Sequence, residues 1–182
     1  MANRLLFASE RGFEQSSADG TGSMLAVLAA AVRRDGRILE IGTGAGVGLA
    51  WIVDGLGHRD DVEVVTIDID TELVAAVAAG DWPHFVRFTV GDALELIPTL
   101  GPFDLIFADA AAGKWYGLAN TIDALTPGGV VVVDDMSPVQ WADDEHELRT
   151  REVRAALLQD SRLVAAELQW ASGLIVATRR GP

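Results

Sequence analysis

The sequence predicts an α/β fold in which a mostly parallel sheet carries helices on both faces. Short runs rich in Val, Ile and Leu alternate along the chain with helical patterns, and neighbouring parallel strands need such crossover connections. The runs are continuously apolar, as expected for strands that are covered on both faces. The last two runs, at residues 163–169 and 173–178, are joined by a short connection, which predicts a hairpin with an antiparallel last strand.

The individual elements follow from breaks and caps along the chain. A loop at residues 16–22 is rich in Ser and Gly and precedes the first predicted helix, which ends before an Asp-Gly pair. The predicted strands before the hairpin are residues 38–41, 62–68, 86–90, 103–108 and 130–133. The predicted helices are residues 23–33, 47–56, 71–80, a short one between residues 93 and 97, 118–125 and 143–159. Pro98 ends the short helix, Asp70 and Thr71 cap the one before it, and a Thr-Pro-Gly-Gly segment closes the one after it.

Length and composition indicate a single folded domain spanning residues 1–182. Of the 182 residues, 49% are hydrophobic, enough for one sizeable core. The chain contains no Cys, which excludes disulfides, thiolate chemistry and zinc–thiolate sites. No apolar stretch reaches membrane-spanning length and the N-terminus does not resemble a signal peptide, so we expect a cytoplasmic protein without a membrane partner.

The charge balance argues against nucleic acid as a partner. The formal net charge is −13, and the basic residues are scattered apart from the pairs Arg33-Arg34 and Arg179-Arg180. A nucleic-acid-binding protein normally gathers basic residues on one face, because neutralising phosphates supplies much of its affinity. A small-molecule partner is therefore the stronger expectation, and a large RNA is disfavoured.

A glycine-rich turn between the first strand and the helix after it organises the chain. Gly42, Gly44 and Gly46 occupy alternate positions there. Glycine lacks the Cβ atom that would keep a ligand away from the backbone, and the helix start offers unpaired N–H groups. A dinucleotide fingerprint needs a third glycine three residues after the second, but Val47 and Leu49 occupy that position in the two registers. The turn therefore does not match a pyrophosphate site.

From Glu40 to Gly46 the chain has the pattern Glu-x-Gly-x-Gly-x-Gly, which resembles the first motif of class I S-adenosylmethionine-dependent methyltransferases. The resemblance implies the Rossmann-like seven-stranded sheet of that class, with S-adenosylmethionine as the cofactor. It places the methionine part of the cofactor over the glycine turn, which Glu40 would organise. A turn that serves only tight packing of strand and helix is the alternative. The residues that would hold the cofactor are Glu40, Gly42, Thr43, Gly44, Gly46, Asp68, Gly91, Asp92, Ala93 and Asp109.

Acidic residues follow several predicted strands at the edge where ligands of such sheets bind. Asp68 ends the second strand, 26 residues after Gly42, where a carboxylate can accept hydrogen bonds from the ribose hydroxyls. Asp92, within Gly91-Asp92-Ala93, matches the adenine-side motif of the resembled family, in which such an acid accepts from the exocyclic amine. One acid is weak support in a chain this acidic, but its repetition at a single edge favours a binding site.

The second half of the chain is similar to the cation-dependent O-methyltransferases of the catechol and caffeoyl-coenzyme A type. The similar residues are Asp109 after the fourth strand, Lys114 and Tyr116 beyond it, and Asp134-Asp135 after the fifth strand. The similarity implies that the three aspartates bind a divalent metal ion, which chelates adjacent hydroxyls of the acceptor. It makes Asp109 and Lys114 the catalytic residues, with the lysine removing the proton. Carboxylate oxygens suit Mg²⁺, with Mn²⁺ or Ca²⁺ as alternatives.

Two departures from that family leave two points undecided. The family spacing is Asp-x-x-Lys, whereas Lys114 follows Asp109 by five residues. Lys114 therefore either reaches the site through a longer loop or is an ordinary surface lysine. Asp135 stands where Asn is commoner, so three negative charges would surround one cation, and like charges this close raise a pKa. A turn pair that only closes the fifth strand is the alternative for Asp134-Asp135.

The sequence thus predicts an enzyme that transfers a methyl group from S-adenosylmethionine to a hydroxyl oxygen of a small, for example catechol-like, molecule, assisted by a divalent cation. The alternatives are a metal-independent methyltransferase acting on another acceptor, such as an RNA nucleoside, and a cofactor-binding module without catalysis. Trp115, Tyr116 and Trp141 are candidates for the walls of an aromatic acceptor site. His146, like the other two histidines, is expected at the surface or in a helix cap. A homodimer is common in the resembled family and is a further expectation.

Overall fold

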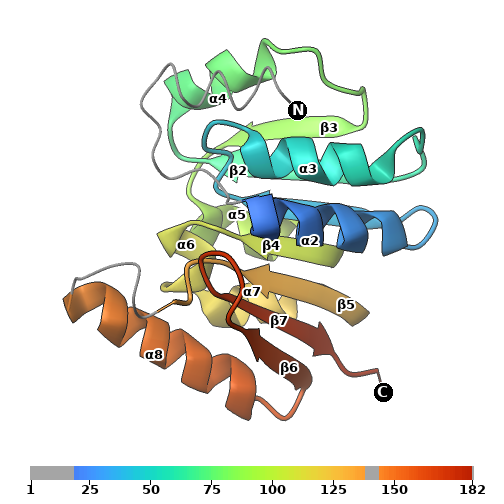
Figure 1. Ribbon diagram of the computed structural model, residues 1–182. Coiled ribbons are helices and arrows are strands. Elements are labelled where there is room, and N and C mark those ends of the chain that lie inside the picture. Colours follow the sequence, from blue (N-terminus) through green and yellow to red (C-terminus); the bar gives the residue numbers. More distant parts are fainter. Residues whose placement is uncertain (1–18, 138–143, 182) are drawn as a thin grey trace.

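The computed structural model describes residues 19–137 and 144–181, which form a seven-stranded sheet with helices on both faces (Figure 1). The strands lie in the order β3-β2-β1-β4-β5-β7-β6. Their bounds are β1 Arg37–Ile41, β2 Glu63–Asp68, β3 Val86–Val90, β4 Phe103–Ala108, β5 Leu125–Val133, β6 Leu163–Leu168 and β7 Leu174–Arg179. The helices are α2 Asp19–Ala31, α3 Val47–Leu56, α4 Thr71–Ala78, α5 Ala93–Leu100, α6 Ala111–Lys114, α7 Leu118–Asp123 and α8 Asp144–Gln159.

The strand directions confirm the predicted topology. β1 pairs with β2 and β4, β2 pairs with β3, and β4 pairs with β5, all in parallel. β7 runs antiparallel to both of its neighbours, β5 and β6. The carboxyl ends of the parallel strands therefore lie along one edge of the sheet, on the left in Figure 1. In sheets of this kind that edge is where ligands bind.

Successive side chains of the central strands face two different cores. On one face, Ile38 of β1 is in a cluster with Leu25 of α2 and Leu49 of α3. On the other face, Leu39 is in a cluster with Ile97 of α5 and Leu157 of α8. Burying one such side chain contributes about 1.5–3 kcal/mol, so the two cores together hold the strand ends in place. Among the described residues, no helix is both long enough and apolar enough to cross a bilayer.

Helix α2 begins earlier than predicted. Residues 19–22 belong to the predicted loop but form the first turn of this helix. A Cβ atom on Gly20 would overlap the indole of Trp170, and one on Gly22 would overlap the indole of Trp51. The two glycines thus let large rings pack against the helix, and these tertiary contacts outweigh the local preference for a turn. Residues 16–18 of the predicted loop lie outside the described residues.

Two more boundaries differ from the prediction. α5 does not stop before Pro98 but continues for one further turn. Ile97, which is 1% exposed, anchors this part of the helix in the core, and only one backbone N–H is lost to the proline. β5 begins at Leu125 and includes the Thr-Pro-Gly-Gly segment. A register shift against β4 between Phe103 and Leu105 accommodates these residues. The prediction missed them because it took the strand to begin where the apolar run begins.

Candidate functional site

Three aspartates meet at the carboxyl edge of β4 and β5. Ala108 and Val133, the last residues of these strands, are register partners, so Asp109 and Asp134 follow side by side on strands about 4.8 Å apart. Asp135 comes next along the chain. One carboxylate oxygen from each aspartate lies within 4.8 Å of the other two. The structure thus brings together the three residues that the sequence predicted as metal ligands.

Asp134 is the most deeply buried of the three, with 2% of its surface exposed. Its Oδ1 accepts hydrogen bonds from the Ser172 hydroxyl, from Asp135 N at 2.7 Å and from Thr21 Oγ1 at 3.5 Å. Burial raises the pKa of Asp134 above its ordinary value, and the negative charge of Asp135 adds to the rise, while the Ser172 hydrogen bond opposes it. The ionised carboxylate is therefore stabilised by any positive charge placed nearby.

Lys114 places a positive charge at this edge. Its side chain is 4% exposed, and its Nζ lies 3.5 Å from Asp135 Oδ2 and 3.3 Å from the Asp134 carbonyl oxygen. Helix α6 is kinked, and Gly113 has a φ of 84°, which turns the chain back so that the next residue points under the strand ends. Lys114 therefore reaches the site although it follows Asp109 by five residues. The alternative of an ordinary surface lysine is wrong.

The first turns of α8 pack against the same site. His146 Nε2 lies 3.1 Å from the Asp135 carbonyl oxygen, and its ring meets Trp115 edge-on with centroids 5.4 Å apart. His146 is only 7% exposed, so the expected surface position is wrong. The reason is that α8, although highly charged, turns this residue toward the site and not toward solvent. The Trp115 ring centroid lies 5.7 Å from Lys114 Nζ, whereas the Tyr116 hydroxyl accepts from Arg149 Nη2 at 3.3 Å. The role of both rings as acceptor walls stays a prediction. Trp141 lies outside the described residues.

The predicted glycine turn lies at the same edge, between β1 and α3. The N–H groups of Gly42 and Thr43 donate to Ile67 O at 2.9 and 3.1 Å, which ties the turn to β2. Gly46 is the N-cap of α3 with a left-handed φ of 77°, and a Cβ atom on it would lie 2.7 Å from Val77 Cγ1. Any larger residue there would be strained by its backbone angle and by this contact. Packing therefore explains part of the glycine pattern, and the cofactor role stays a prediction.

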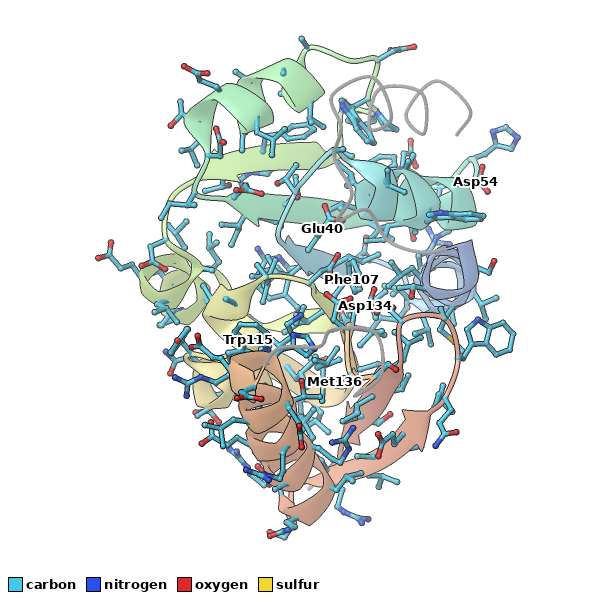
Figure 2. The ribbon with its side chains drawn as sticks, turned by 60° about the vertical axis from the view of Figure 1, so that its left-hand side comes forward. Glu40, Asp54, Phe107, Trp115, Asp134 and Met136 are labelled. Carbon is cyan, nitrogen blue, oxygen red and sulfur yellow. The ribbon has the colours of Figure 1, made fainter. Side chains whose placement is uncertain are left out.

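Glu40 is buried beneath this turn in β1, which β4 separates from the end of β5 and Asp134 (Figure 2). Its Oε2 accepts from Thr66 Oγ1 at 2.6 Å, and the Thr66 and Thr43 hydroxyl oxygens are 2.7 Å apart. A Cβ atom on Gly48 would lie 2.5 Å from Glu40 Oε1, so this glycine makes room for the carboxyl group. Burial raises the pKa of Glu40 to about 8, against the Thr66 hydrogen bond. A cationic group above the turn would favour the ionised form.

Asp68 is the last residue of β2 and Asp92 follows β3, as predicted. Asp68 Oδ2 accepts from Gly44 N at 3.0 Å, and its Oδ1 accepts from Asp70 N at 3.1 Å. Asp92 is the N-cap of α5, and its Oδ1 accepts from Leu94 N at 2.8 Å. Both acids thus stabilise local structure at the ligand edge. Their contacts with ribose and adenine stay predictions.

Sequence reasoning missed the hydroxyl groups that hold these acids. Thr66 had one usable signal, because it is a polar residue in an apolar strand and the register partner of Glu40. Thr21 and Ser172 bind Asp134 from positions 113 and 38 residues away, and both fall in segments predicted as loops. No local pattern in the sequence connects such distant residues.

A sheet in this strand order, with a glycine turn after β1 and acids after β2, β4 and β5, has the architecture of the class I methyltransferases. Comparisons with known proteins agree with that class. The methyltransferase domain family matches residues 39–136. A protein of Mycobacteroides abscessus, provisionally named an O-methyltransferase, is 32% identical over 187 residues, which cover 94% of this chain and 86% of that protein. The chain belongs to the family of S-adenosylmethionine-dependent O-methyltransferases.

Solved structures confirm the fold. A crystal structure of a Corynebacterium glutamicum protein has a TM-score of 0.83 with 23% identity, covering 100% of this chain and 89% of that one. The crystal structure of an O-methyltransferase from Bacillus cereus in complex with S-adenosylhomocysteine has a TM-score of 0.79 with 20% identity, covering 98% of this chain and 90% of that one. The seven-stranded methyltransferase sheet predicted from the sequence is therefore confirmed.

Proposed function

We propose that the protein transfers the methyl group of S-adenosylmethionine to a hydroxyl oxygen of a small molecule with adjacent hydroxyls, assisted by a divalent cation. The convergence of one oxygen each from Asp109, Asp134 and Asp135 within 4.8 Å carries the proposal. The Bacillus cereus enzyme of the same fold was crystallised with S-adenosylhomocysteine, which supports S-adenosylmethionine as the cofactor. The net charge of −13 favours a small acceptor over a polyanion such as RNA.

The donor set fits a hard divalent cation. Carboxylate oxygens are the ligands that Mg²⁺, Mn²⁺ and Ca²⁺ prefer, and Mg²⁺ keeps positions open for other oxygen ligands. Asp134 is buried beside Asp135, so its ionised form gains from positive charge, of which Lys114 supplies one unit. When bound, a divalent cation lowers the pKa of an acceptor hydroxyl and fixes the position of its oxygen. Mg²⁺ is the ion we expect.

The residues of the chain would bind, orient and deprotonate the acceptor. Asp109, Asp134 and Asp135 would hold the ion. Lys114 Nζ lies 3.5 Å from Asp135 Oδ2. We propose that the ammonium group first releases a proton to solvent and that the neutral amine then takes the proton of the acceptor hydroxyl. The ring of Trp115 is held in place by His146 and would orient an aromatic acceptor. Because methyl transfer needs the acceptor oxygen in line with the sulfur–carbon bond, this positioning accounts for much of the expected rate gain.

The test is methyl transfer from S-adenosylmethionine to a panel of catechols and matched monophenols, followed by mass spectrometry. We expect methylated product from the catechols, its loss after EDTA treatment and its return on adding Mg²⁺. Asp109→Ala should lower turnover by more than about 100-fold, because it removes a ligand and not merely a group that orients one. Asp54→Ala is the matched control, since this exposed aspartate lies on α3, away from the site in Figure 2.

Each alternative predicts a different result in the same assay. Turnover that survives EDTA and the Asp109→Ala substitution would indicate a metal-independent methyltransferase. Calorimetric binding of S-adenosylhomocysteine without turnover of any acceptor would indicate a cofactor-binding module without catalysis. Failure to bind S-adenosylhomocysteine would contradict the proposal as a whole.

A further inference from the structure

Two hydroxyl groups from distant parts of the chain meet at the buried Asp134 carboxylate. Thr21 lies in the first turn of α2 and is 0% exposed, and Ser172 lies in the turn between β6 and β7 and is 4% exposed. The Ser172 hydroxyl donates to Asp134 Oδ1, and Thr21 Oγ1 lies 3.5 Å from that oxygen and 3.3 Å from Ser172 Oγ. Both hydroxyls therefore engage the same carboxylate oxygen, Oδ1.

The backbone fixes Ser172 relative to the end of β5. Ser137 N donates to Ser172 O at 2.9 Å, and Met136 N donates to Gly173 O at 2.9 Å. Gly173 has a φ of 82°, and a Cβ atom on it would overlap Ser137 N. The β6–β7 turn is thus bonded to the segment that directly follows the aspartates. Ser172 therefore has a fixed position relative to this segment and can hold the Asp134 side chain in one orientation.

Helix α2 is fixed against the same turn. Gly20 gives the room in which the Trp170 indole and the Ala171 methyl group pack, so the start of α2 and the β6–β7 turn are in contact. This contact places Thr21 next to Ser172, behind Asp134. The two hydroxyls reach the carboxylate from two elements that are separately packed, which restricts its rotation more than a single partner would.

We propose that Ser172, supported by Thr21, is a positioning residue that orients Asp134 as a ligand of the divalent cation. The inference rests on the proposed function, because it needs the cation. Metal-binding carboxylates are commonly held by such hydrogen bonds, and removing one typically costs 10–100-fold in metal affinity. The 3.5 Å separation of Thr21 Oγ1 from Asp134 Oδ1 is long for a hydroxyl donor, so Ser172 makes the larger contribution.

The test measures Mn²⁺ binding by electron paramagnetic resonance, and S-adenosylhomocysteine binding by calorimetry, on the full chain. Ser172→Ala should weaken Mn²⁺ binding by about 10-fold, and Thr21→Val by about 3-fold, while Thr21→Ser keeps the hydroxyl and should restore wild-type binding. S-adenosylhomocysteine affinity should not change. The matched control is Thr126→Val, because Thr126 Oγ1 donates to Asp104 Oδ1 at 3.0 Å at the opposite edge of the sheet.

The outcomes separate this inference from the proposed function. Wild-type Mn²⁺ affinity in both Ser172→Ala and Thr21→Val would overturn the positioning role and leave the cation site standing. A loss in Thr126→Val as large as that in Ser172→Ala would overturn it as well, because any lost hydroxyl would then have the same effect. If the wild-type protein bound no Mn²⁺, both the inference and the cation part of the proposed function would fall. Should Ser172→Ala not fold, the comparison of Thr21→Val with Thr21→Ser decides.

Discussion

Replacing Glu40 by Gln should flatten the pH dependence of the stability of the cofactor-free protein. The carboxyl group is fully buried, and burial raises its pKa from 4.5 to about 8 in the folded protein. Between these values the folded protein retains a proton that the unfolded chain has released. The free energy of unfolding therefore falls as pH rises through this window, whereas below pH 4.5 the group makes no difference. The amide of the Glu40→Gln protein cannot ionise, so the substituted protein lacks this loss.

The size of the effect follows from the difference between the two pKa values. One pKa unit corresponds to about 1.36 kcal/mol, so a rise from 4.5 to about 8 corresponds to a loss of at most about 5 kcal/mol on ionisation. Water entry and rearrangement around the ionised carboxylate reduce that loss, as they do for other buried charges. We therefore expect that going from pH 5 to pH 8.5 destabilises the wild-type protein by about 2–4 kcal/mol more than Glu40→Gln.

Urea unfolding of both proteins at several pH values measures this difference. Subtracting the two curves removes the contributions of all other titrating groups, which the proteins share. Glu95→Gln is the matched control, because Glu95 is exposed on α5 and the substitution makes the same chemical change at a solvated position. Parallel stability curves for the wild type and Glu40→Gln would refute the reasoning, since they would mean that Glu40 titrates alike in the folded and unfolded chains.

Three further substitutions test the site. Asp135→Asn keeps an oxygen ligand and should retain turnover within about 10-fold, whereas Asp135→Ala should lose Mg²⁺-dependent turnover; equal activities would exclude Asp135 as a ligand. Lys114→Met should lower turnover by about 10²–10⁴-fold with unchanged S-adenosylhomocysteine affinity, and turnover near the wild-type rate would exclude Lys114 as the base. Gly48→Ala places a Cβ atom 2.5 Å from Glu40 Oε1 and 3.0 Å from Phe107 Cε1. Urea unfolding should therefore show that the free energy of unfolding falls by about 1–3 kcal/mol. An unchanged free energy of unfolding would show that helix α3 shifts freely to make room.

The sheet and its acidic edge could be predicted because both depend on short-range patterns. An apolar run shows where a strand ends, and the parallel register then decides which end residues become neighbours. Ala108 pairs with Val133, so Asp109 and Asp134 had to lie side by side once β4 and β5 were recognised as adjacent. The order of the strands in the sheet was not predicted, and only the structure shows that β4 and β5 are neighbours.

The parts that could not be predicted depend on contacts between distant segments. The reach of Lys114 follows from the kink at Gly113, and a count of residues from Asp109 does not reveal a kink. Thr21 and Ser172 are 151 residues apart in sequence and come together only because α2 and the β6–β7 turn pack against each other. Such contacts leave no periodic signal, because the sequence does not distinguish a Ser or Thr that makes a long-range contact from any other Ser or Thr in a loop.

Charge explains why these separate pieces form one site. Three carboxylates within 4.8 Å repel one another, and the chain as a whole is already strongly acidic. Before an acceptor is bound, the ammonium group of Lys114 compensates one of the three charges through Asp135, at 3.5 Å. Two negative charges then remain, which is the amount that a single divalent cation neutralises. Since burial and Asp135 both raise the pKa of Asp134, a proton competes with the cation for this carboxylate, and cation affinity should fall as pH falls. Mn²⁺ affinity that did not fall with pH would contradict this competition between proton and cation at Asp134.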